Sequence, residues 1–228
     1  MIETALPSSR AAAVAGSRTS APAIRRRCPV AGLRAAALLL LLGHGLLSFP
    51  AAAEPSNLVV RPLVEKQLAE LPPGPLVWRI ETFPALADAR AAEGPTALVA
   101  EAGGRVWLFT LGPGGGASRG GTKVAEVGPL PVTQAPRYLL RINQASGPPG
   151  AVTPVHTHPG SEAFYVLAGE TTQRTPHGAV RVGTGQAIAG HGADMPMEVS
   201  SSGATDLLSL VMFVVDATKP FSSMAGIR

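Results

Sequence analysis

Short strand-like runs separated by turn residues make up most of the chain after residue 75, and this pattern limits the fold more than any other feature. The 26 glycines and 22 prolines of the chain punctuate these apolar runs. Sustained 3.6-residue periodicity is almost absent. The sequence therefore predicts an all-β barrel or sandwich in which helix is a minor component. The predicted strands are Leu76–Phe83, Ala97–Ala102, Arg105–Leu111, Thr122–Val127, Arg137–Asn143, Ala163–Leu167, Ala179–Val182 and Leu207–Val215.

Two glycine-containing segments lie between these strands. Gly103-Gly104 is typical of a two-residue hairpin turn. Gly112–Gly121 is most simply a flexible surface loop, because a phosphate-binding loop would need to join a strand to a helix and no such context is visible.

The segment before the strands is less regular. We assign residues 54–75 to an N-terminal arm, in which the apolar residues between Leu58 and Leu71 allow a short helix or an extended arm before Pro72-Pro73-Gly74-Pro75 ends it. No internal repeat is visible, and about 175 residues suit one elaborated barrel better than two. We therefore expect a single domain with accessory β-strands over residues 76–136.

The first 53 residues have the order of a secretory signal. They contain six arginines and one acidic residue, and Arg25–Arg27 and Arg34 precede an apolar run from Ala35 to Phe49. Ala51–Ala53 then supplies the small residues that a signal peptidase recognises. We expect a signal peptide over residues 1–53, a mature chain that starts near Glu54, and a periplasmic or extracellular location without a stable membrane span.

Alternatives to this processing stay open. A retained anchor is disfavoured because a membrane span needs about 20 apolar residues. Paired arginines allow twin-arginine export, although Cys28-Pro29-Val30 fits that signal poorly, and a start codon at Val14 or Val30 is also compatible with the sequence. Cys28 is the one cysteine of the chain, so the processed protein is expected to have neither a disulfide nor a thiol nucleophile.

The charge of the remaining chain excludes some partners. Residues 54–228 contain 13 basic and 14 acidic side chains, so the body is almost neutral. No basic patch for nucleic acid stands out, and no Ser/His/Asp set for nucleophilic catalysis is apparent.

Three metal-ligand side chains lie close together in the sequence. His156 and His158 are two residues apart in an extended segment, so both imidazoles are expected on the same face. Pro159-Gly160-Ser161 forms a turn, and Glu162 opens the next strand with a carboxylate that can reach the same point. The pattern predicts one divalent transition metal held by these three residues, with copper, iron, manganese, zinc and nickel all compatible.

The spacing of these residues resembles the first sequence motif of the cupin superfamily. Gly150, His156, His158, Glu162 and Gly169 match every fixed position of that motif. The resemblance implies a cupin barrel of the double-stranded β-helix or jelly-roll type over residues 137–216, followed by a C-terminal tail over residues 217–228. It also implies a metal in the barrel mouth, and a homodimer in which the Leu58–Leu71 arm crosses to a second copy is one arrangement that cupins adopt.

The second motif of the superfamily departs from its pattern. It normally ends in a Pro-His pair whose histidine completes the metal shell, and here Pro196-Met197 stands at that position. Met197 is therefore the predicted fourth ligand, and a thioether suits copper better than zinc. Packing of Met197 against the barrel mouth and recruitment of His191 from the same loop remain alternatives.

Further residues are predicted around the site. Phe164 and Val166 share the face of Glu162 by strand alternation and are assigned, with His191, to an apolar pocket, whereas Tyr165 should point the other way. Arg141 and Asn143 are pocket candidates on the preceding strand, with a solvent-facing arginine as the alternative. His177 is most simply a turn residue.

Several functions are compatible with such a domain. The first is an exported metal-binding cupin that binds and oxidises a small organic molecule, in which case it would be a metal-dependent oxygenase or isomerase. The second is a non-catalytic periplasmic cupin for metal handling or ligand sensing. The third is a metal-free interaction module.

Overall fold

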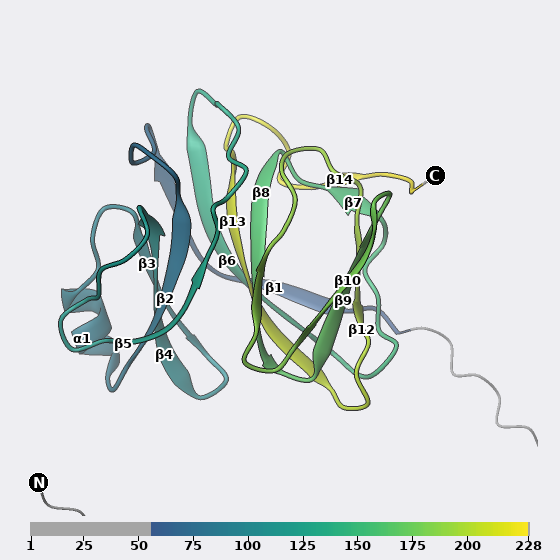
Figure 1. Ribbon diagram of the computed structural model, residues 1–228, viewed down its shortest axis with the longest axis horizontal. Coiled ribbons are helices and arrows are strands. Elements are labelled where there is room, and N and C mark those ends of the chain that lie inside the picture. Colours follow the sequence, from purple (N-terminus) through teal and green to yellow (C-terminus); the bar gives the residue numbers. More distant parts are fainter. Residues whose placement is uncertain (1–55, 228) are drawn as a thin grey trace, which may run out of the picture. The chain divides into compact units, whose positions relative to one another are not determined.

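Residues 56–227 are described by a computed structural model, and the predicted signal peptide lies outside this range. The described part is almost entirely antiparallel β-structure, with α1 (Leu86–Ala91) as its one α-helix (Figure 1). The strands are β1 (Val59–Leu68), β2 (Val77–Phe83), β3 (Ala97–Ala102), β4 (Arg105–Gly112), β5 (Thr122–Val127), β6 (Tyr138–Gly147), β7 (His156–Thr157), β8 (Gly160–Ala168), β9 (Glu170–Thr175), β10 (Gly178–Gly183), β11 (Ala187–Ala189), β12 (Glu198–Ser201), β13 (Leu207–Asp216) and β14 (Ser223–Met224).

The strands form a barrel and an accessory sheet. One wall of the barrel is the sheet β1-β6-β13-β8-β11, and the other wall consists of the sheet β10-β9-β12 together with the pair β14-β7. The accessory sheet has the order β3-β4-β2-β5. The all-β class and the jelly-roll barrel with extra N-terminal strands are confirmed, and all eight predicted strands are present within a few residues of their predicted bounds.

Side-chain alternation along the central sheet separates two cores. On β8, Phe164 and Val166 face the barrel interior, where they pack with residues such as Phe213. Tyr165 faces the accessory sheet, where its ring lies 5.9 Å from that of Trp107. Because neighbouring side chains of a strand point to opposite faces, one sheet serves as a wall of both cores. The prediction that Tyr165 points away from Glu162 is confirmed.

Residues Leu58–Leu71, for which the sequence allowed either a short helix or an extended arm, form mainly strand β1. It pairs antiparallel with β6 from Val59 opposite Ser146 to Leu68 opposite Tyr138. A register irregularity at Pro62 fits the position of β1 at the edge of its sheet, where a missing N–H is tolerated. Pairing with β6 satisfies the backbone groups of β1 that point towards β6, a long-range interaction that no local periodicity could indicate.

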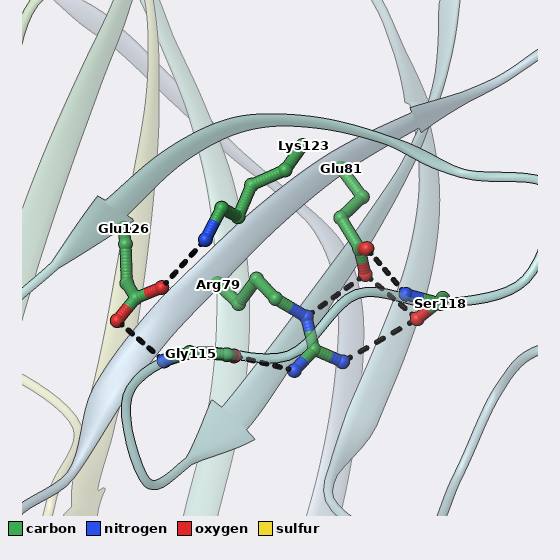
Figure 2. A network of polar contacts seen from close by, with 6 residues as sticks. All are labelled: Arg79, Glu81, Gly115, Ser118, Lys123 and Glu126. Carbon is green, nitrogen blue, oxygen red and sulfur yellow. Dashed lines mark hydrogen bonds and ion pairs between the residues drawn. The ribbon is translucent and has the colours of Figure 1, made fainter.

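Two glycine predictions meet different outcomes. Gly103 and Gly104 both have positive φ, 56° and 70°, and form the tight turn between β3 and β4. Gly112–Gly121 is a surface loop, but polar contacts fasten it to the accessory sheet (Figure 2). The backbone N–H and hydroxyl of Ser118 both donate to the buried carboxylate of Glu81 at 2.7 Å, and the N–H of Gly115 donates to Glu126 at 2.9 Å.

Within residues 56–227, no helix has the length and hydropathy required to cross a bilayer.

Candidate metal centre

A cavity of about 390 Å³ opens at one end of the barrel interior. Strands β6, β8 and β13 contribute one group of the lining residues, and β1, β7, β12, the loops beside β7 and the C-terminal segment contribute the others. Its lining comprises Leu58, Val60, Arg141, Asn143, Ala145, Thr153, Pro154, His156, His158, Glu162, Phe164, Val199, Val211, Phe213, Phe221, Ser222 and Met224. The two histidines and the glutamate of the first motif therefore face one space, as strand alternation predicts.

The glycine that closes the motif has a steric role. Gly169 lies between β8 and β9 with φ of +74°, and a Cβ atom there would lie 2.6 Å from the carbonyl oxygen of Asp206. Only glycine satisfies both the positive φ and this close approach. The turn returns the chain from the glutamate-bearing strand to the opposite wall of the barrel.

Both imidazoles are oriented by backbone carbonyl groups. Nδ1 of His156 lies 2.8 Å from the carbonyl oxygen of Pro154, and Nδ1 of His158 lies 2.7 Å from that of Phe221. A carbonyl oxygen can only accept, so each Nδ1 donates its hydrogen. In a neutral imidazole that donates from Nδ1, the lone pair lies on Nε2 and is available to a metal. Histidines that bind a metal are commonly held by this arrangement. The ring centroids are 5.0 Å apart.

Glu162 is a buried carboxyl group at the start of the cavity wall. It is 2% exposed, and burial raises its pKa to about 8, although the hydrogen bond from Gln173 opposes that shift. Nε2 of Gln173 lies 2.5 Å from Oε1 of Glu162. Such a carboxyl group is neutral at pH 7 unless a cation accompanies it, so a bound cation would favour its ionised form.

His158 has the complementary property. Burial lowers its pKa to about 4, the hydrogen bond to Phe221 opposes this, and the nearby His156 and Arg141 lower it further. Its Nε2 lies 3.8 Å from Oε2 of Glu162. Near pH 7 this contact joins a neutral imidazole to a neutral carboxyl group, so it is not an ion pair. The imidazole is ready to bind a metal without first losing a proton.

The donor types fit a divalent transition metal, although the side chains are not gathered around one point. In the part of the chain that the structure describes, no group of three or more His, Cys, Asp or Glu side chains is placed to hold an ion as it stands. The fit rests on the chemistry of the donors: two imidazoles held through their Nδ1 atoms and a buried carboxyl group line the same cavity.

Met197 is close to this set but is not among the residues that line the cavity. Its backbone pairs with that of His156 through two hydrogen bonds of 2.9 Å, so the second motif does lie opposite the first. The thioether is 1% exposed and accepts a 3.3 Å hydrogen bond from Nε2 of Gln173. Gln173, which the sequence did not single out, therefore lies between Glu162 and Met197.

The other predicted pocket residues fall in different places. Phe164 lines the cavity. Val166 shares its face but is fully buried in the barrel core and does not line the cavity, because it lies further along β8. His191 does not line the cavity either, since its loop places its ring 6.4 Å from that of His177.

Three lining residues were weak candidates or were missed from the sequence. Arg141 and Asn143 line the cavity, so the solvent-facing alternative for Arg141 is excluded. Phe221 comes from the predicted tail and packs against His158, with ring centroids 4.7 Å apart. Strand alternation from Tyr138 onward could have placed Arg141 and Asn143, but no local signal identifies Phe221.

The fold and the cavity define a β-barrel domain of the double-stranded helix type, with a histidine pair and a glutamate in its mouth. Residues 146–191 match the family model described as "Cupin domain", and the chain has a cupin domain. No curated protein matches the chain.

Solved structures with a similar arrangement include three of different origin. The DMSP lyase DddQ from Ruegeria pomeroyi is 23% identical over 38% of this chain and 43% of that one, with a TM-score of 0.33. A cupin-like protein from Thermotoga maritima is 16% identical over 39% and 65%, with a TM-score of 0.34. The polyketide cyclase RemF from Streptomyces resistomycificus is 22% identical over 39% and 62%, with a TM-score of 0.32. The match thus spans less than half of the lyase.

Proposed function

We propose that this cupin domain binds one divalent transition metal through His156, His158 and Glu162, and that the cavity around the metal takes a small organic molecule. One observation supports this most strongly. Two imidazoles whose Nδ1 atoms are fixed by backbone carbonyls line the same cavity as a fully buried carboxyl group. A cation would compensate the ionised carboxylate, for which residues 56–227 supply no charged partner in direct contact.

The chemistry available depends on the bound metal. A divalent ion with three protein ligands keeps open coordination positions and supplies a Lewis acid or an oxygen-binding centre. The residues of the chain hold it there: Phe221 orients His158, and Gln173 orients Glu162. The apolar side chains Phe164, Val211 and Phe213 line the cavity and would contact the apolar part of a bound molecule. Oxidation or isomerisation of the bound molecule is the enzymatic form of this proposal.

A non-catalytic role in copper handling is the second candidate, and Met224 favours it. This methionine lines the cavity, is 77% exposed, and stands opposite His156 in the β14–β7 pair. An exposed thioether beside an imidazole is a ligand pair that suits copper, in particular its reduced form. In this form of the proposal the metal itself is the cargo of the domain.

Export from the cytoplasm is part of the proposal. The basic segment, the apolar run and Ala51–Ala53 support cleavage before Glu54 and a periplasmic or extracellular location. Expression of the full chain in a bacterial host, followed by cell fractionation and N-terminal sequencing, tests this. A protein that stays in the cytoplasm with an intact N-terminus would overturn it.

The metal proposal is tested by elemental mass spectrometry on residues 54–228. We expect one metal per chain after exposure to copper, zinc, iron, manganese or nickel, and loss of that metal in His156→Ala. His177→Ala is the matched control, because His177 is exposed and does not line the cavity. If none of the five metals is taken up, the metal site fails and a metal-free interaction module becomes the leading function.

A further inference from the structure

Two hydrogen-bond donors on β6 give the cavity a polar wall that the metal ligands do not use. Arg141 and Asn143 are two residues apart on this strand, so both face the barrel interior. The side chain of Arg141 is 18% exposed and Asn143 is 1% exposed. A charged and a polar side chain at such depth require either partners within the protein or a ligand that supplies them.

The guanidinium group of Arg141 is held on three sides. Its Nε donates to Oδ1 of Asn143 at 2.8 Å, and its Nη1 lies 2.9 Å from the carboxylate of Glu65, which stands opposite it on β1. Its Cζ lies 4.1 Å from the centroid of the Phe221 ring. These contacts fix the plane of the group and leave Nη2 without a hydrogen-bond partner among residues 56–227.

The amide of Asn143 also has an unused donor. Arginine can only donate, so the atom of Asn143 that faces Nε must be its oxygen, and this fixes the orientation of the amide. Nδ2 then has no partner in the described part of the chain. Asn143 is one of the residues that line the cavity, so this donor is on the cavity wall. The wall therefore offers two adjacent N–H donors and one positive charge.

The rest of the cavity sets the character of the molecule that these donors would bind. Its other walls are largely apolar, and Glu162 is the one acidic side chain among the residues that line it. The ring of Phe221 contacts both Arg141 and His158, so the donor pair and the imidazoles are separated by a single aromatic ring. A volume of about 390 Å³ is near the lower limit of ligand cavities, which favours a small ligand.

We propose that Arg141 and Asn143 form an anion subsite that binds the carboxylate of a small carboxylic acid with an apolar body. A planar carboxylate accepts from Nη2 of Arg141 and Nδ2 of Asn143 together, and its apolar part packs against Phe164, Val211 and Phe213. This inference rests on the proposed function, in that it names the chemical class of the small molecule that the cavity takes.

Glu65 gives the subsite a distinctive dependence on charge. Its carboxylate pairs with Nη1 of Arg141 and is 46% exposed, so water screens the pair and Glu65 competes only in part with a second anion. Removal of the Glu65 charge should strengthen binding of a carboxylate at Arg141. A purely structural Arg141–Glu65 pair would not produce that gain.

The test is calorimetric titration of residues 54–228 with benzoate and with its neutral isostere benzamide. We expect benzoate to bind at least about tenfold more tightly than benzamide, since one charge-assisted pair of hydrogen bonds is at stake. Arg141→Met, which keeps an apolar side chain against Phe221, should remove most of this preference, and Glu65→Gln should strengthen benzoate binding. Arg181→Met is the matched control, because Arg181 is exposed on β10.

The titrations are run on metal-loaded and metal-free protein, with metal content and circular dichroism measured on each variant. Benzoate binding that depends on Arg141 in the absence of metal would support the subsite even if the metal proposal fails. Absence of benzoate binding at millimolar concentration, equal binding of benzamide, or an unchanged affinity in folded Arg141→Met would each overturn the subsite. The metal proposal is judged separately by its stoichiometry.

Discussion

Nδ1 of His158 lies 2.7 Å from the carbonyl oxygen of Phe221, although the two residues are 63 positions apart in the chain. The ring of Phe221 packs against the imidazole of His158 and lies under the guanidinium group of Arg141. The C-terminal segment, which includes β14 paired with β7, thus forms part of the cavity that the first motif begins. The candidate centre therefore depends on the first motif and on the C-terminal segment together.

Removal of this segment should weaken the metal site. A chain that ends at Thr218 loses the carbonyl that orients His158, and loss of such a partner typically costs about 10–100-fold in metal affinity. Phe221→Ala keeps the carbonyl and should bind metal almost as the parent does. Competition with a chromophoric chelator measures both affinities. A chain ending at Gly226 is the control, and equal affinity in the Thr218 truncation would mean that the carbonyl does not orient the ligand.

The stability of the metal-free protein should fall as pH rises from about 6.5 to about 8. Burial raises the pKa of Glu162 from 4.5 to about 8, so in this range the folded state keeps a proton that the unfolded chain has lost. Burial lowers the pKa of His158 from 6.5 to about 4, so between 4.5 and 6.5 its effect has the opposite sign and cancels that of Glu162. The free energy of unfolding should therefore change little between pH 4.5 and 6.5 and decline between pH 6.5 and about 8.

Urea unfolding in the presence of a chelator measures this profile. The slope that Glu162 contributes can reach about 1.4 kcal/mol per pH unit, the value for one proton. Glu162→Gln should abolish the decline above pH 6.5, because an amide does not titrate there. Added metal should also remove it, since the ion binds the ionised carboxylate. A wild-type profile that coincides with that of Glu162→Gln would show that this carboxyl group does not control the pH response.

The surface loop Gly112–Gly121 should become more susceptible to trypsin when Glu81 on β2, which accepts hydrogen bonds from the loop, is substituted. Burial alone would raise the pKa of Glu81, but hydrogen bonds from Ser118 and Arg79 outweigh burial and lower it. Glu81→Gln replaces an acceptor oxygen with a donor and should cost about 2–3 kcal/mol of unfolding free energy. Trypsin should then cleave faster after Arg119, which is exposed in this loop.

The pH dependence of this contact has a definite sign. Because the pKa of Glu81 is lowered on folding, its stabilising effect is complete above 4.5 and is lost as the pH falls below that value. Glu81→Gln should therefore be less sensitive to acid than the parent. Glu101→Gln, at an exposed position on β3, serves as the control. Unchanged trypsin cleavage in Glu81→Gln would mean that other contacts, such as Gly115 to Glu126, suffice to fasten the loop (Figure 2).

The sequence predicts strands and motif residues well where the signal is local. The eight apolar runs with flanking turns are strands. Side-chain alternation also predicts that His156, His158 and Glu162 face the same space, and all three line one cavity. Strand β9 escapes detection because its buried face consists of Thr171, Gln173 and Thr175. A polar inward face gives no hydrophobic alternation, so a buried glutamine cannot be distinguished from an exposed one.

Long-range pairing accounts for the rest of what the sequence could not predict. The position of Phe221 depends on the pairing of β14 with β7, and strand β1 depends on β6, with which it pairs from Val59 opposite Ser146 to Leu68 opposite Tyr138. The second motif illustrates the limit most clearly. The backbone of Met197 pairs with that of His156, so the second motif lies opposite the first, yet the direction of the thioether depends on Gln173, which lies on another strand.

The role of Met197 can be decided by a substitution that keeps its volume. The structure places its thioether 3.3 Å from Gln173 and leaves it out of the cavity lining, so we expect Met197→Leu to retain the metal. A volume-conserving change of a buried methionine costs less than about 1.5 kcal/mol. Met212→Leu, on the fully buried face of β13 towards the accessory sheet, is the control for packing alone. If Met197→Leu loses metal affinity while Met212→Leu does not, the thioether is a ligand, as the second motif predicts, and Gln173 must release it when the metal binds.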